Sequence, residues 1–94
     1  MMRIIVDPDM AGTVLDATEH TRETRRSAID EIASRLEDRL AAMGLEHIEV
    51  EREYRTTGRR DDSGDGVLST ILDEVLIEQV DDIRSALGLG TVAS

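Results

Sequence analysis

The stretch DPDMAGTVLDATEHTRETRRSAIDEIASRLEDRLAAM, residues 7–43, decides the fold, because its apolar side chains recur with the period of one long helix. Asp7 is a suitable N-cap, and Pro8 supplies a preset φ at the first helical position. Gly44 is a typical residue just after a helix end. One stripe of this helix contains Val14, Thr18, Thr21, Arg25, Ile29, Ile32, Leu36, Leu40 and Met43. The sequence predicts a helix over about residues 8–43, with a second start at the approximate capping box of Thr13 and Asp16 and a first turn that can fray or kink at Gly12.

The middle of this stripe is poor in apolar side chains. Thr21 and Arg25 stand where leucine or isoleucine would fill a core. The guanidinium of Arg25 must extend to solvent from a locally thin core or meet a carboxylate across an interface. Both interpretations are open, and Thr21 and Arg25 are therefore candidates for an interface.

Two short segments predict strands on either side of the long helix. Residues 3–6 are a run rich in β-branched side chains, and residues 47–55 alternate apolar with charged side chains. A right-handed β-α-β connection would join them in a short, parallel, two-stranded sheet.

A second helix is predicted over about residues 67–87, ending at Gly88. Its apolar positions span about half of its circumference, which is more than one neighbour would cover. We therefore expect self-association, with interface candidates Leu72, Leu76, Val80, Ile83 and Leu87.

The predicted fold is a helix-dominated α+β structure in the order β-α-β-α, as a single domain over residues 1–94. Residues 56–66 are expected to be a flexible polar loop, and residues 89–94 a loose tail.

Composition narrows the function. The chain has 94 residues and a formal charge of −10, which argues against binding to nucleic acid or to an anionic membrane. It has no cysteine, and Tyr54 is its only aromatic residue, which makes a pocket for a stacked cofactor improbable. The opening apolar run is too short for a signal peptide or a membrane span, so the expected location is the cytoplasm. All basic residues are arginine, and this acidic, aromatic-poor composition suits a GC-rich genome or a possible halophile.

One acidic turn resembles part of a calcium-binding loop. Asp61, Ser63 and Asp65 occupy ligand positions 1, 3 and 5, with Gly66 at position 6. Position 12 is Leu72 instead of the bidentate carboxylate, and no entering helix precedes the turn. A solvated acidic turn is the preferred interpretation, and no metal or cofactor is predicted.

Other polar residues do not form a recognisable catalytic set. Residues 56–60, TTGRR, would suit a phosphate, but the spacing of a P-loop is missing and Asp61 and Asp62 oppose the charge. His20 and His47 lack partners at metal-ligand spacing. The sequence therefore predicts that the protein is not an enzyme.

The opening Val6-Asp7-Pro8-Asp9-Met10, followed by a long helix, resembles the first helix of the small helical-hairpin proteins of type VII secretion. The resemblance covers less than half of the chain. The Trp-x-Gly turn of that family is missing, and the strand-like residues 47–55 stand where its second helix would continue.

Three functions follow from these observations. The preferred one is a non-catalytic assembly or interaction subunit whose partner is a second copy or another protein. The first alternative is a regulator that responds to a ligand or metal through residues 56–66. The second is a small helical protein similar to those of type VII secretion.

Overall fold

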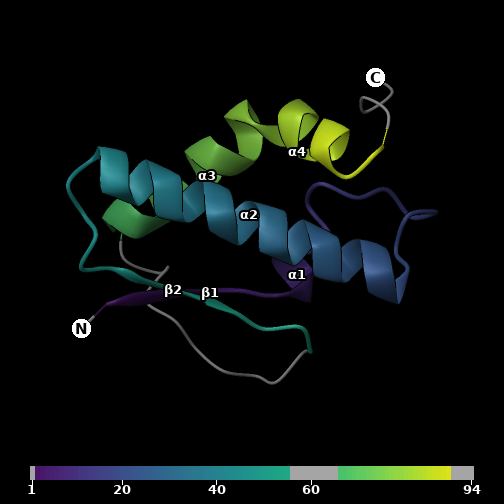
Figure 1. The fold of residues 1–94 in the computed structure, drawn as a ribbon, viewed down its shortest axis with the longest axis horizontal. Helices are drawn as coiled ribbons and strands as arrows, with labels where there is room; N and C mark the ends of the chain where they lie inside the picture. Colours follow the sequence, from purple (N-terminus) through teal and green to yellow (C-terminus); the bar gives the residue numbers. More distant parts are fainter. Residues whose placement is uncertain (1, 56–65, 90–94) are drawn as a thin grey trace.

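A long helix lies between a two-stranded sheet and a pair of shorter helices in the computed structural model, which describes residues 2–55 and 66–89 (Figure 1). The elements in chain order are β1 (Arg3–Val6), α1 (Pro8–Ala11), α2 (Arg22–Ala42), β2 (Glu49–Arg52), α3 (Gly66–Glu78) and α4 (Val80–Ala86). α2 contacts both strands and both later helices. The predicted α+β class, with two strands joined through a long helix, is confirmed.

The strands are parallel, as predicted, and pair Ile4 with Val50 and Val6 with Arg52. Ile4 and Val6 are fully buried in the core shared with α2. β2 covers only part of the predicted strand over residues 47–55.

The helix predicted over residues 8–43 is wrong in its first third. Asp7 does cap a helix, because its side chain accepts a hydrogen bond from Met10 N at 3.1 Å, but α1 ends after one turn at Ala11. α2 begins at Arg22, after ten intervening residues, and the Thr21 hydroxyl accepts from Thr24 N at 3.1 Å at its start. Thr21 is therefore a helix cap and not part of an apolar stripe.

Local hydrogen bonds explain the interruption. The Asp16 carboxylate accepts from the backbone N–H of Thr18 at 2.9 Å, and the Thr13 hydroxyl donates to Met10 O instead of forming the predicted capping box. Short polar side chains that bond nearby backbone in this way compete with helix formation. The connection also buries Val14 and Leu15 in the core.

The C-terminal part of α2 follows the predicted pattern. Its buried residues are Ala28, Ile29, Ile32, Ala33, Leu36 and Leu40. Met43 was expected on the same stripe, but it lies beyond the helix and is 49% exposed. The chain turns at Gly44, whose φ of 74° suits a residue without a side chain.

The second predicted helix is divided into α3 and α4 at Gln79, whose φ and ψ are −109° and 10°. Both segments pack on α2, and Val75 and Ile83 on either side of the break are fully buried. α4 ends before Gly88, where φ is 76°. In the described parts of the chain, no helix is both long and apolar enough to cross a membrane.

Candidate functional site

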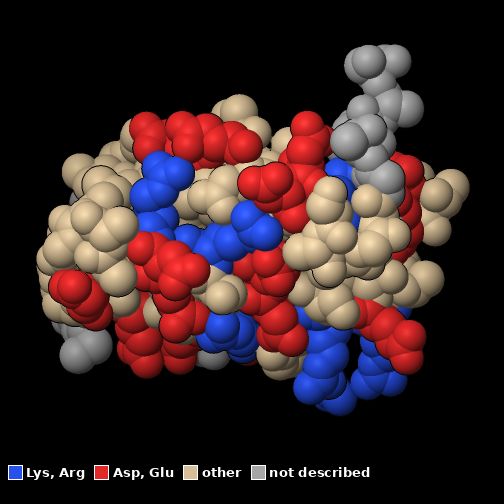
Figure 2. Space-filling view, turned by 45° about the horizontal axis from the view of Figure 1, so that its top comes forward, with Lys and Arg blue, Asp and Glu red and all other residues tan. Residues whose placement is uncertain are grey.

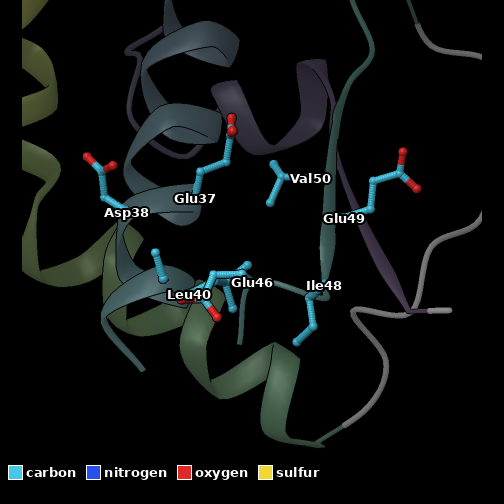
Figure 3. A pocket seen from close by; sticks show the side chains of 8 residues that line it. Glu37, Asp38, Leu40, Glu46, Ile48, Glu49 and Val50 are labelled. Carbon is cyan, nitrogen blue, oxygen red and sulfur yellow. The ribbon is translucent and has the colours of Figure 1, made fainter. Parts of the chain in front are cut away.

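The candidate site is the seam between α2 and the chain segment that contains β2. At one end, a groove of about 500 Å³ lies between the C-terminal half of α2 and the start of β2. Its residues are Glu37, Asp38, Leu40, Ala41, Glu46, Ile48, Glu49 and Val50, which we call the acidic groove. Figure 3 shows Val50 and Ile48 on the strand side of the space, facing the helix, while the Glu49 carboxylate points away from it.

Most carboxylates of the acidic groove have no cationic partner among the residues that the structure describes. Glu37 is the exception, because Arg52 Nη2 lies 2.7 Å from its Oε1. Asp38, Glu46 and Glu49 make no such ion pair within residues 2–55 and 66–89. Glu46 therefore brings uncompensated negative charge to the groove, and the carboxylates of Asp38 and Glu49 carry more on its two outer sides (Figure 3).

A set of polar contacts fixes the middle of the seam. Arg52 also approaches Asp30, with 3.6 Å between Nε and Oδ1. The Tyr54 hydroxyl donates to Asp30 Oδ1 at 2.5 Å, and this hydrogen bond raises the pKa of Tyr54. The guanidinium of Arg26 stacks over the Tyr54 ring, 4.5 Å from its centroid. The Tyr54 ring is thereby held against α2.

The other end of the seam carries positive charge. Pro8, Arg22, Arg25, Tyr54 and Arg55 line a pocket of about 380 Å³, which we call the arginine pocket. Arg25 is partly buried there, whereas Arg22 and Arg55 are exposed. Figure 2 shows basic side chains gathered at the end of the molecule where α2 begins.

A buried ion pair lies outside the seam and connects α4 to the segment before α2. Arg84 is 3% exposed, and its Nη1 and Nη2 donate to the two carboxylate oxygens of Glu19 at 2.6 and 2.8 Å. Nη1 also donates to Val14 O at 2.7 Å. This geometry satisfies a guanidinium that would be costly to bury alone.

The ion pair changes the acidity of both groups. Hydrogen bonds from Arg84 and then from the backbone of Asp16 lower the pKa of Glu19 from 4.5 to about 2. The same bond from Arg84 to Glu19 raises the pKa of Arg84. Because these described bonds join separate parts of the fold, we assign the pair to stability and not to chemistry.

Other charged residues fasten α2 to α3 and α4. Arg39 Nη2 lies 2.9 Å from Glu78 Oε2, and Arg35 Nη1 donates to the Gln79 side chain at 2.9 Å. Figure 2 shows this boundary as basic side chains flanked by acidic ones. The side chains of Arg35 and Arg39 therefore bind other parts of the same chain.

The predicted interface residues separate into two groups. Leu72 and Ile83 are 8% and 0% exposed and belong to the core, so their assignment to a surface contact is corrected. Leu76, Val80 and Leu87 are partly buried and pack against that core. The predicted second helix is divided into α3 and α4, and both pack on α2. This packing covers most of the apolar face for which the sequence had suggested no partner.

Of the two candidates from the long stripe, Arg25 lines the arginine pocket and Thr21 caps α2 next to it. The possible calcium ligands Asp61, Ser63 and Asp65 lie outside the described residues. Within the described ranges, no three Asp, Glu or His side chains are grouped to hold a metal. The resemblance to type VII secretion proteins depended on a continuous first helix, which the structure divides.

Comparisons of the chain with family models, with curated proteins and with solved structures found no match.

Proposed function

We propose that this chain is a non-catalytic interaction subunit that self-associates through the seam between α2 and β2. The observation that carries this proposal is the arrangement of charge along the seam, with the acidic groove at one end and the arginine pocket at the other. A two-fold axis over the middle of the seam brings each arginine pocket against the acidic groove of the second copy. Each contact is then made twice.

The separation of the two ends supports this arrangement. Arg25 and Asp38 lie in the same helix, and thirteen residues at 1.5 Å each place them about 20 Å apart along its axis. This distance exceeds the Debye length of about 8 Å at physiological ionic strength. The two ends therefore do not neutralise each other within one copy, and both remain available to a partner.

Charge also selects the orientation of the second copy. A parallel arrangement would bring two arginine pockets together and two acidic grooves together, which is unfavourable. The antiparallel arrangement replaces both repulsions with attractions, and it covers the partly exposed apolar side chain of Val50.

The ionisable groups with shifted pKa values support a non-catalytic role. Glu19 and Arg84 are bonded to each other, and Tyr54 is bonded to Asp30. Each shift is caused mainly by a contact that also holds two elements of the fold together. We therefore assign none of these groups to proton transfer to a substrate.

The proposal is tested by light scattering on a size-exclusion column, with loading concentrations from about 10 µM, within the micromolar range of ordinary association, up to about twenty times higher. The dimer fraction should fall as sodium chloride rises, because screening weakens the contacts between charged ends. Arg25→Glu and Glu46→Arg should each reduce dimerisation, and the double variant should restore it. Asp81→Arg, an exposed change on α4 away from the seam, is the matched control.

Two results would refute self-association through the seam. The first is a monomer at every concentration. The second is a dimer that neither single charge reversal weakens more than the Asp81→Arg control does.

A further inference from the structure

The arginine side chains that line the arginine pocket differ from the other described arginines in the contacts that they make. The other arginines with described positions have assigned contacts: Arg3, Arg35, Arg39, Arg52 and Arg84 form ion pairs, and Arg26 stacks on Tyr54. The side chains of Arg22, Arg25 and Arg55 make no hydrogen bond or ion pair with any residue that the structure describes.

This grouping is unexpected in an acidic chain. Acidic residues outnumber basic ones by 21 to 11, so carboxylates are in ample supply. Even so, among the described residues three guanidinium groups without a carboxylate partner, those of Arg22, Arg25 and Arg55, line one concavity. We propose that the arginine pocket is a binding site for a tetrahedral oxyanion, namely a phosphate group on a small molecule or as the free ion.

The chemistry of the pocket fits this ligand. Each guanidinium presents several N–H donors in a planar fork that matches two oxygens of a phosphate, and such charge-assisted hydrogen bonds are among the strongest in proteins. A phosphate group carries about −1.5 to −2 charge at neutral pH, so three arginines can compensate one or two phosphate groups.

The size and rigidity of the pocket also fit. Its volume of about 380 Å³ is at the low end for small-molecule sites, which typically span about 300–1,000 Å³. Tyr54 forms a wall that is fixed by its hydrogen bond to Asp30 and by Arg26 over its ring. Arg25 rises from α2 and is partly buried, so its position is constrained before any ligand arrives.

This inference concerns a single copy of the chain and does not depend on self-association. If self-association also uses the arginine pocket, the oxyanion and the acidic groove of a second copy compete for the same three arginines. Phosphate would then favour the monomer, in a manner that sodium chloride at equal ionic strength does not reproduce.

The test is a titration of the full chain, followed by NMR through the Nε–H signals of its arginines. The protein concentration is one at which light scattering shows only monomer, so the result is independent of dimerisation. Inorganic phosphate and pyrophosphate are the probes, and sodium chloride at matched ionic strength is the control. The two probes distinguish a pocket for one phosphate group from a pocket for two.

We expect saturable shifts for Arg22, Arg25 and Arg55 with at least one of the two probes. Arg25→Gln should raise the dissociation constant about tenfold or more, as expected for losing hydrogen bonds to a charged group. Arg39→Gln removes the same charge from the far side of α2, next to Glu78, and should leave the affinity within about twofold, as expected for a site without direct contact. Circular dichroism confirms that both variants fold.

The proposal is overturned if neither probe gives saturable shifts at millimolar concentration, or if sodium chloride reproduces them. It is also overturned if Arg39→Gln weakens binding as much as Arg25→Gln does. That result would indicate a general effect of net charge and not a site.

Discussion

Replacing Ile32 with alanine should destabilise the protein far more than the same replacement at Ile77. Ile32 lies in α2 and is fully buried, whereas Ile77 lies in α3 and is 75% exposed. The change removes three carbon atoms. At about 0.8 kcal/mol for each buried methylene, the transfer term at Ile32 is about 2.4 kcal/mol, and the cavity left behind brings the total to roughly 3–4 kcal/mol.

The total stability of a chain of this size is on the order of 5–14 kcal/mol, so the Ile32→Ala variant should fold but melt much earlier. At about 4–8 °C for each kcal/mol, its melting temperature should fall by about 12–30 °C. Ile77→Ala should change the free energy of unfolding by less than about 0.5 kcal/mol, because no buried contact is lost and alanine is the better helix former.

Urea unfolding followed by circular dichroism measures both variants, with molecular mass checked in parallel so that any change in association is separated from folding. A loss below about 1 kcal/mol at Ile32, or an equal loss at Ile77, would refute α2 as the centre of the core.

Three further predictions concern single residues. Because the pKa of Glu19 is lowered on folding, its contribution to stability is fully present above pH 4.5 and is lost as pH falls towards about 2. Urea unfolding across this pH window should therefore show a smaller loss of stability in Glu19→Gln than in the wild type. Equal losses of stability would contradict a role of Glu19 in stability. Thr21→Ala removes the N-cap of α2 and should lower the free energy of unfolding in urea by about 1 kcal/mol. An unchanged unfolding midpoint would contradict this prediction. Gly44→Ala should lower the melting temperature by an amount equivalent to about 1–2 kcal/mol, since φ is 74° there; an equal or higher melting temperature would show that the turn relaxes without strain.

Much of the fold was predictable because α2 follows simple periodicity after residue 28. The helix start at Asp7 and Pro8 was also recognised correctly. The ten residues between α1 and α2 were missed because Val14 is in phase with the stripe of α2, although it reaches the core from a turn. Periodicity cannot distinguish these two routes to burial, since it records only which positions are apolar.

The break at Gln79 was missed for a different reason. No proline or glycine stands there, so the sequence contains no local signal for a helix end. The cause is the packing of α3 and α4 on α2, which also buries Leu72 and Ile83. The surplus of apolar surface inferred for a straight second helix was therefore overestimated.

The candidate site was only partly predictable. Arg25 was recognisable because it interrupts an apolar stripe, and it does line the arginine pocket. Arg55 follows β2 and reaches the same pocket through the tertiary fold, without a spacing that sequence reasoning could use. Arg84 and Glu19 are 65 residues apart and make a contact that no local pattern marks.

The arginine pocket shows why a net charge of −10 is a weak guide to local binding. Screening over about 8 Å means that the field at any site is set mainly by the nearest side chains. Five arginines elsewhere are held in ion pairs with carboxylates, so each removes negative charge from its own surroundings without creating a basic site. Among the residues that the structure describes, the arginines without a carboxylate partner lie around the start of α2, and so an acidic protein can still present a small basic pocket.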